Sequence, residues 1–332
     1  MSAGVDTAGA RNPWLTVDAW RRLFRDRPLV PLTGLLVVLV VALQLVRPGI
    51  VTADWFGVTL RAAIPLAILA GCQTLCMLTG GIDLSVGAVA SMAAFVMATL
   101  ATEQGPAVAI AVGLIVAILA GLVNGVGIGI FKVHPLIMTL GMGLVLLGLT
   151  SVYQLAMVQS PVDVPDFIEW LGSETTLTFL PNNLLVYLPI AALIIIGLRR
   201  SGYGRLLFAV GDNPIAARLA GARVWQVLVA LYIISAVLAA IAGFLVAGLV
   251  KTATIQLVES SVLPSVAAAV IGGTSIMGGR GGYAGTIVGA LILVVLTTLL
   301  TALDMPEAAK QMLFGLIIVL VAAAYTRVTG ES

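Results

Sequence analysis

Residues 227–250 read VLVALYIISAVLAAIAGFLVAGLV, an apolar run without one charged side chain. A helix of about 20 apolar residues is long enough to cross the hydrocarbon core of a bilayer. Other runs of this character fill most of the chain: Leu29–Val46, Val58–Thr79, Leu84–Ala101, Pro106–Phe131, Pro135–Val158, Asn183–Leu198, Leu263–Met277, Tyr283–Ala302 and Gln311–Tyr325. The sequence therefore predicts an all-α, polytopic membrane helical bundle of about ten segments. The count falls to eight or nine if short segments such as Leu263–Met277 are re-entrant or broken.

The composition supports this prediction. Of the 332 residues, 60% are hydrophobic and 10% are charged, and the mean hydropathy is +1.14. A soluble protein carries about a quarter charged residues. We expect a cytoplasmic N-terminal tail over residues 1–28, a single transmembrane domain over 29–326 and a short cytoplasmic C-terminal tail over 327–332.

The distribution of basic residues predicts the orientation, because Lys and Arg accumulate on the cytoplasmic side. With the N-terminus inside and every segment crossing, only Arg47, Arg61, Lys251 and Lys310 of the 17 bases lie outside. The sharpest contrast is between two loops. The predicted periplasmic loop 159–182 has four acids and no base, whereas the predicted cytoplasmic loop 199–226 contains five arginines. Both termini are then cytoplasmic.

The chain lacks the groups that catalysis requires. It has one histidine, His134, and no metal-protease or phosphate-loop motif. Cys72 and Cys76 lie four residues apart within one apolar run and are interpreted as packing residues. We therefore predict no catalytic residue, no metal site and no cofactor in this chain. The net charge of +2 reflects topology and does not indicate nucleic-acid binding.

The most informative motif is Gly80-Gly81-Ile82-Asp83-Leu84-Ser85-Val86-Gly87-Ala88-Val89, which interrupts two apolar segments. Gly80 and Gly81 permit backbone conformations that other residues avoid. Broken backbone at membrane depth is tolerated where it is buried in protein or faces a water-filled cavity. The motif is either a polar turn at the translocation path or an ordinary cytoplasmic turn with Asp83 capping the next helix.

A second glycine cluster covers residues 271–282 and includes Gly272, Gly273, Gly278 and Gly279. Its position in the second half of the chain is compatible with a duplicated transporter architecture, and close helix packing explains it equally well. Two sets of glycines repeat every four residues, which favours close approach of helices in lipid: Gly121, Gly125 and Gly129, and Gly281, Gly285 and Gly289.

The loop 199–226 contains a helix start, because Asp212-Asn213-Pro214 supplies a capping side chain and then a proline. The sequence predicts a short helix over Ile215–Leu219 that ends at Gly221. Such a helix on the cytoplasmic face suits docking into a groove on a partner. The arginines of loop 199–226, including Arg218, also fix the topology.

Four stretches together resemble the permease subunits of bacterial ABC importers of the ribose/xylose/galactose type. They are Gly80–Val89, Lys132-Val133-His134-Pro135-Leu136-Ile137-Met138-Thr139-Leu140-Gly141, Gly204–Gly221 and Ile271–Gly282, and the agreement runs from about residue 60 to residue 325. Ala216-Ala217 followed by Gly221 is similar to the loop that contacts the ATPase in such permeases. The chain departs from the family pattern at His134, Leu136, Leu147 and Ile215, where many members have Pro, Phe, Arg and Glu.

The resemblance implies a type II-like ABC importer permease in the bacterial inner membrane, without an ATPase site of its own. A cytoplasmic ATPase would bind ATP and Mg, and a periplasmic or lipid-anchored protein would bind the substrate. A second copy of the chain or a sister permease would complete the pore within the membrane lipid. The residues expected to couple to the ATPase are Asp212, Asn213, Pro214, Ala216, Ala217, Arg218 and Gly221.

We therefore expect ATP-driven import of a monosaccharide or related small polyol by alternating access. Polar residues within apolar segments are the candidates for the translocation path: Gln73, Asp83, Ser85, Asn124, Thr139 and Gln154. For each of them a structural hydrogen bond between helices is an equally good interpretation. The alternatives are a nucleoside or branched-chain amino-acid permease of the same superfamily, or an ion-coupled secondary transporter that uses Asp83.

Overall fold

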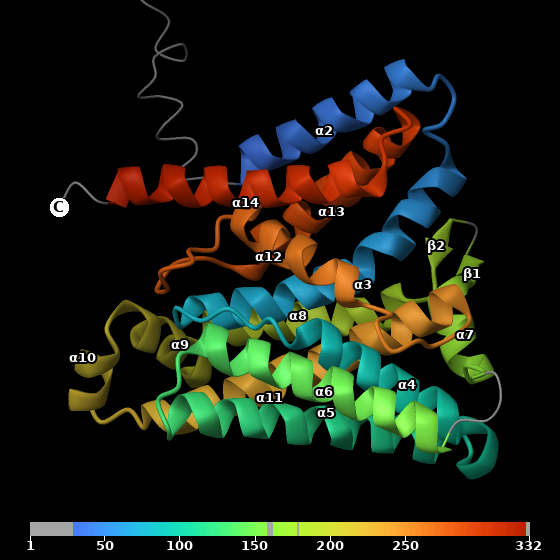
Figure 1. Cartoon of the computed structure of the whole chain (residues 1–332). Helices are drawn as coiled ribbons and strands as arrows, with labels where there is room; N and C mark the ends of the chain where they lie inside the picture. Colours follow the sequence, from blue (N-terminus) through green and yellow to red (C-terminus); the bar gives the residue numbers. More distant parts are fainter. Residues whose placement is uncertain (1–28, 158–161, 178, 330–332) are drawn as a thin grey trace, which may run out of the picture.

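Long helices occupy most of the predicted segments. The computed structural model describes residues 29–157, 162–177 and 179–329. Its longest helices are α2 (Leu29–Val46), α3 (Ala53–Leu78), α4 (Val86–Gln104), α5 (Pro106–Gly129), α6 (Pro135–Met157), α11 (Val224–Val250), α13 (Tyr283–Ala302) and α14 (Glu307–Thr329). They lie side by side in one bundle (Figure 1). The expected tail 1–28 and the last three residues of the C-terminal tail lie outside the described residues.

Within the described residues, seven helices are long and apolar enough to cross a membrane. An eighth crossing would run through α8 (Leu184–Arg200) and α9 (Gly202–Asp212). Together these two helices are also long and apolar enough to cross, but they are bent by 68° relative to each other. The predicted all-α membrane bundle is confirmed. α14 runs back toward the end of the bundle at which α2 begins (Figure 1).

The segment predicted over Leu263–Met277 is not one spanning helix. It consists of the ten-residue helix α12 (Val262–Ile271), which follows the short 3-10 helix η2 (Glu259–Ser261), and a non-helical loop over 272–282. Ten helical residues cover about 15 Å, half of the hydrocarbon thickness. The sequence leaves open whether this segment spans, re-enters or is broken, and in the structure its helix ends at Ile271. The sequence also predicts that the third segment opens at Leu84, but α4 begins only at Val86.

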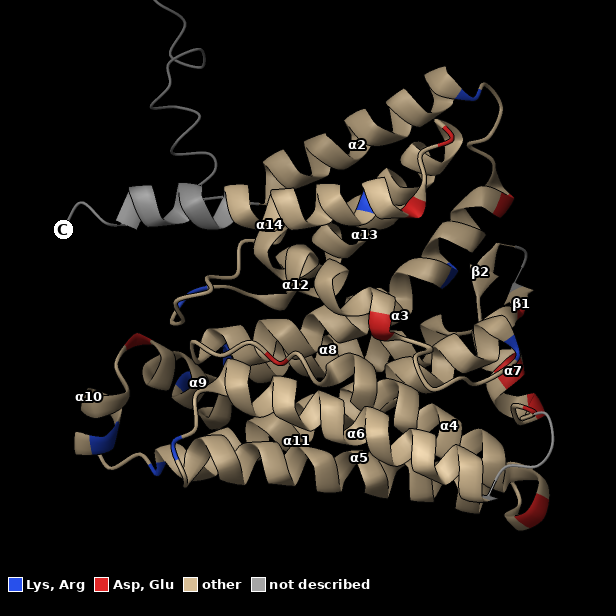
Figure 2. Cartoon of the chain, viewed as in Figure 1, with Lys and Arg blue, Asp and Glu red and all other residues tan. Residues whose placement is uncertain are grey.

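The two predicted loops contain secondary structure at opposite ends of the bundle. Loop 199–226 contains α9 and α10 (Pro214–Leu219), and loop 159–182 contains α7 (Asp166–Ser173) and a small hairpin of β1 (Thr175–Leu177) and β2 (Leu180–Pro181). Figure 2 shows basic residues gathered at α9 and α10 and acidic residues at and around α7. The charge asymmetry of the sequence is thus an asymmetry between the two ends of the bundle.

Glycines bring α5 and α11 into backbone contact. A Cβ added at Gly125 would lie 2.6 Å from Val229 Cα, and one at Gly129 would lie 2.9 Å from the Trp225 carbonyl oxygen. The repeat of glycines on α13 acts in the same way against α12, where Gly289 faces the backbone of Ala268. The packing role predicted for these glycines is confirmed. Close backbone approach is how helices gain van der Waals contact in lipid, where no hydrophobic force drives them together.

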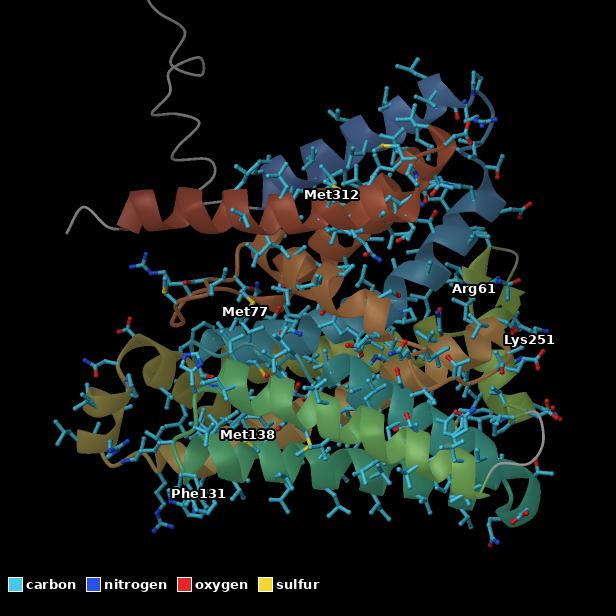
Figure 3. All side chains as sticks on the ribbon, in the orientation of Figure 1. Arg61, Met77, Phe131, Met138, Lys251 and Met312 are labelled. Atoms are coloured by element: carbon cyan, nitrogen blue, oxygen red, sulfur yellow. The ribbon has the colours of Figure 1, made fainter. Side chains whose placement is uncertain are left out.

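The outer surface of the bundle is apolar, as a lipid-facing surface must be. Phe131 and Met312 are 74% and 77% exposed and point away from the bundle, whereas Met77 is fully buried (Figure 3).

At the acidic end, the Lys251 ammonium group forms an ion pair with Glu169 and ties α7 to the end of α11. The hydrogen bond from Lys251 to Glu169 raises the pKa of Lys251 above its ordinary value.

Candidate functional site

The chain between α3 and α4 leaves the helical path while still inside the bundle. Gly80 has a φ of 77°, a left-handed conformation that suits glycine. The segment from Gly81 to Ser85 then runs without helical hydrogen bonds until Val89 N donates to Ser85 O. Polar backbone groups buried in this way must find other partners, because burial inside the bundle separates them from water.

Side chains of neighbouring helices supply these partners. Gln73 on α3 donates through Nε2 to the Asp83 carbonyl oxygen at 2.7 Å, and its Oε1 accepts from Asp83 N at 3.3 Å. Thr139 on α6 accepts from Leu84 N at 3.1 Å. The Thr139 hydroxyl also lies 3.3 Å from the Ile82 carbonyl oxygen. The broken segment is therefore held by hydrogen bonds from two helices.

The Asp83 side chain is the centre of a second set of bonds. It is 2% exposed, and its Oδ1 accepts from Ser85 N at 3.0 Å and from Ser85 Oγ at 2.6 Å. Its Oδ2 accepts from Ser235 Oγ on α11 at 2.9 Å. Asn124 on α5 donates through Nδ2 to Ser85 Oγ at 2.9 Å. Within the described residues the ion pairs lie elsewhere, so Asp83 is stabilised by hydroxyl and amide donors and not by a cation.

Five of the six predicted path residues thus meet in one buried network that joins α3, α5, α6 and α11. They are Gln73, Asp83, Ser85, Asn124 and Thr139. Gln154 does not join them and lies exposed on α6. Asp83 caps its own turn through Ser85, and burial inside the bundle rules out a solvent-exposed turn for its carboxylate. A role of these residues in translocation stays a prediction.

Two residues of this region are not evident from the sequence. Ser235 completes the hydrogen bonding of Asp83, and it is a lone serine in the long apolar run that forms α11. Tyr232, one turn earlier, is 1% exposed, and a Cβ added at Gly81 would lie 2.8 Å from its hydroxyl oxygen. Each of these residues places a hydroxyl group in an otherwise apolar segment, and this is the only feature of the sequence that marks them. The sequence does not indicate which residue each hydroxyl group contacts.

Three chain segments meet at a second place, formed almost entirely by backbone. Gly279 N donates to the Leu78 carbonyl oxygen at 3.0 Å. A Cβ added at Gly211, near the end of α9, would overlap that same oxygen and lie 2.7 Å from Gly279 N. A Cβ at Gly278 would lie 2.8 Å from the Gly211 carbonyl oxygen and 3.1 Å from Gly80 N. We call this contact of Leu78–Gly80, Gly211 and Gly278–Gly279 the glycine junction.

The short helix α10 follows the glycine junction directly. Asn213 caps it, because its Oδ1 accepts from Ile215 N and Ala216 N, both at 3.0 Å, and Pro214 is its first residue. Gly221, with a φ of 92°, ends the turn after it. The helix start and stop predicted from the sequence are confirmed. Ala217 is buried, while Asp212, Ala216 and Arg218 are exposed.

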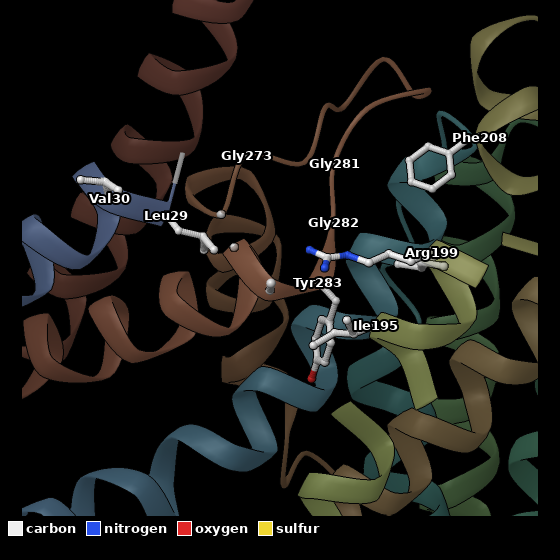
Figure 4. A pocket seen from close by; sticks show the side chains of 13 residues that line it. Leu29, Val30, Ile195, Arg199, Phe208, Gly273, Gly281, Gly282 and Tyr283 are labelled. Carbon is white, nitrogen blue, oxygen red and sulfur yellow. The ribbon is translucent and has the colours of Figure 1, made fainter. Parts of the chain in front are cut away.

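A cavity of about 700 Å³ opens beside the second glycine cluster (Figure 4). It is lined by the start of α2, the end of α8, Phe208 of α9 and the start of α13, with Gly273 and Gly282 on one side. Arg199 contributes the charged group of its lining, and the rest is mainly apolar. Gly272 also lines the cavity, and its backbone packs against Thr286.

Little else in the described residues offers chemistry. In that part of the chain, no group of three His, Cys, Asp or Glu side chains is arranged to hold a metal ion. Cys72 and Cys76 are buried, and Cys72 Sγ lies 3.4 Å from the Ile68 carbonyl oxygen and 3.3 Å from the Ser235 carbonyl oxygen. His134 is exposed at the end of the loop before α6.

We expect Asp83 and Ser235 to act as one unit in stability. Asp83→Asn and Ser235→Ala should each lower the free energy of unfolding in detergent by about 1–3 kcal/mol, because each leaves a buried polar group without its partner. The double variant should lose less than the sum, with a coupling of about 0.5–3 kcal/mol. Thr150→Ala is the matched control, since Thr150 is also buried but bonds only to Leu146 of its own helix. Additive losses for Asp83 and Ser235 would contradict the network.

Comparisons with known proteins agree with this architecture. Residues 57–322 match the protein family described as "Branched-chain amino acid transport system / permease component". The chain is similar to the fructose import permease protein of Rhizobium meliloti, with 30% identity over 298 residues that cover 86% of this chain and 83% of the relative. It is 32% identical to the ribose import permease protein of Escherichia coli (strain K12) over 294 residues, which cover 86% and 90%.

A third relative, the galactofuranose transporter permease protein of Escherichia coli (strain K12), is 34% identical over 265 residues that cover 79% of this chain and 76% of the relative. No solved structure matches the chain. The family match extends from α3 into α14 and includes both the buried Asp83 network and the glycine junction. The chain therefore belongs to this family of transport-system permease components.

Proposed function

We propose that this chain is the membrane-spanning permease of an ATP-driven importer and that its substrate is a monosaccharide. The observation that carries the substrate class is that the relatives named above, aligned over about four-fifths of the chain or more, import fructose, ribose or galactofuranose. The chain itself supplies the membrane passage. ATP hydrolysis with Mg would occur on a cytoplasmic ATPase, and a periplasmic or lipid-anchored protein would deliver the sugar.

The outward surface of α10 suits the docking of such an ATPase. Ile215 and Leu219 are 69% and 85% exposed, so two large apolar side chains project from this short helix. Ala217 is 7% exposed and packs against the rest of the chain. A helix that presents apolar side chains on one face can insert into a groove of a partner. Closure of the two ATPases would then move α10.

The glycine junction would transmit this movement. α10 is joined to Gly211 through Asp212 and Asn213, and Gly211 touches Leu78 at the end of α3 and Gly279 of the second glycine cluster. Direct contact of backbones leaves no soft side chain to absorb a displacement. The buried network of Asp83 holds the continuation of α3 to α5, α6 and α11, so these helices would move together. Alternating access of the pore requires a coupling of this kind between the ATPase and the transmembrane helices.

A second copy of this chain, or a sister permease, would complete the pore. The branched-chain amino acids named in the family description make them the second candidate substrate class. Competition of labelled-sugar uptake by unlabelled ribose, fructose and leucine separates the two classes.

Ion-coupled transport through Asp83 is less well supported, because both of its carboxylate oxygens already accept hydrogen bonds from serine residues.

Replacing the exposed apolar residues of α10 tests the docking. Ile215→Glu and Leu219→Glu should each weaken co-purification of the ATPase about tenfold or more, because burial of such a side chain contributes about 1.5–3 kcal/mol. Sugar uptake should fall in parallel while the permease stays in the membrane. Arg200→Glu is the control, since Arg200 is exposed at the same end but lies outside α10. Normal ATPase binding and uptake in both α10 variants would contradict this docking surface.

Replacing Gly211 tests the glycine junction. Gly211→Ala should reduce uptake at least tenfold and abolish the response of ATP hydrolysis to substrate, because the added methyl group would overlap the Leu78 carbonyl oxygen. Gly202→Ala on the same helix is the control, because its Cβ would meet only the tip of Arg205 at 3.8 Å. Alanine favours a helix by about 1 kcal/mol over glycine at either site, so helix propensity does not explain a difference between the two variants. Wild-type uptake in Gly211→Ala would show that the junction transmits nothing.

The orientation is tested by labelling with an impermeant thiol reagent on intact cells whose outer membrane is permeable to it. A cysteine at Glu174, exposed before the hairpin, should react, and one at Arg200, exposed at the opposite end, should react only after lysis. The native cysteines, Cys72 and Cys76, are buried and give little background. The reverse pattern would overturn the assignment of the basic end to the cytoplasm.

A further inference from the structure

A cavity of about 640 Å³ lies between the end of α5, the short helix α10 and the start of α11. Its wall is largely apolar and includes Ile128, Trp225 and Leu228. Ile130 and Trp225 are about half exposed. Phe131, next along the chain, points away from the bundle (Figure 3). The cavity therefore borders exposed apolar side chains on the surface of the bundle.

Three cations surround this apolar wall. Lys132 follows α5, Arg218 lies on α10 and Arg223 precedes α11, and all three line the cavity. No acidic side chain of the described residues lines it. Both ion pairs in the described part of the chain involve other lysines, Lys251 and Lys310. Three basic residues thus line an apolar groove whose described lining holds no group of opposite charge.

The position along the bundle fixes what can reach this groove. It lies at the basic end, where Figure 2 shows Lys and Arg residues on α10 and at the neighbouring ends of helices. Trp225 at the first turn of α11 is typical of a side chain at the level of lipid headgroups. A free phosphate ion would use the three charges but not the apolar wall. A lipid uses both, because its headgroup is charged and its acyl chains are not.

We propose that this groove binds an anionic phospholipid of the cytoplasmic leaflet, with its phosphate among Lys132, Arg218 and Arg223 and an acyl chain along Ile128 and Leu228. Basic pockets between transmembrane helices on the cytoplasmic side are known to bind acidic headgroups. One of the three cations belongs to α10, so the bound lipid braces this helix against α5 and α11. This proposal and the proposed function both assume that the basic end of the bundle faces the cytoplasm. Lipid binding otherwise requires neither a sugar nor an ATPase.

The test is native mass spectrometry of the detergent-purified full chain incubated with phosphatidylglycerol or phosphatidylcholine. Wild type should retain phosphatidylglycerol in preference. Each of Lys132→Gln, Arg218→Gln and Arg223→Gln should weaken its retention about fivefold, the effect of one Lys or Arg near an acidic lipid surface. Arg200→Gln and Arg205→Gln, at the same end but outside the lining, should leave retention unchanged.

A pair of isoleucine variants tests the apolar wall without changing the charge. Ile130→Trp should fill the groove and lower retention of phosphatidylglycerol, whereas Ile115→Trp, exposed elsewhere on α5, should not. Equal retention of the two lipids, or unchanged retention in the three charge variants, overturns the proposal. Loss of ATPase binding with intact lipid retention assigns the three cations to the ATPase and also overturns it.

Discussion

The need to satisfy broken backbone inside a membrane protein governs the centre of this structure. Between Gly80 and Ser85 the chain gives up helical hydrogen bonds inside the bundle, where its buried backbone groups need partners from the protein. The side chains of Gln73, Thr139 and Asp83 supply the missing partners, because they form hydrogen bonds with backbone groups of this same segment. Because these partners lie on different elements, the break is also the place where the helices are fastened to one another.

This fastening explains the buried carboxylate. An unpaired buried charge costs several kcal/mol, yet Asp83 has no cation beside it in the described part of the chain. Hydrogen bonds to a charged group contribute about 1.5–3 kcal/mol each, and Asp83 accepts three of them from Ser85 and Ser235. The carboxylate reaches two separate chain segments at once, which one neutral hydroxyl group does less well.

The membrane bundle, its charged ends and the break at Gly80–Ser85 are predictable from the sequence, because these features depend on local hydropathy and on the backbone freedom of glycine. The cap at Asn213 is predictable too, since it is a local hydrogen bond. The helix α9 is not, because Gly202–Asp212 contains few features of a long apolar helix. Nor can the sequence pair Asp83 with Ser235, because these residues are 152 positions apart and only the packing of α3 on α11 brings them together.

Glycine shows the same limit in another form. Gly125 places the backbone of α5 against that of α11, and Gly211 lies against the Leu78 carbonyl oxygen, whereas a Cβ added at Gly148 on α6 would meet nothing within 4 Å. All three are helical glycines in or beside apolar runs, and their sequence surroundings do not distinguish them. Which one tolerates a methyl group is decided by the neighbouring element, and so by the tertiary fold.

The buried network also constrains where a sugar could pass. Sugar hydroxyls need free donors and acceptors, whereas five of the six polar residues predicted for the path form hydrogen bonds with one another or with backbone. Among the buried side-chain atoms of these five residues, only Asn124 Oδ1 has no partner among the described residues. A sugar that bound to Asp83 or Thr139 would have to displace bonds that hold the helix break in place. Gln154 is different, because it is exposed on α6 of the single chain. Surfaces that are exposed in one subunit and covered on assembly can line a pore without dismantling the centre of the bundle. The polar network is therefore better suited to transmit movement than to bind substrate.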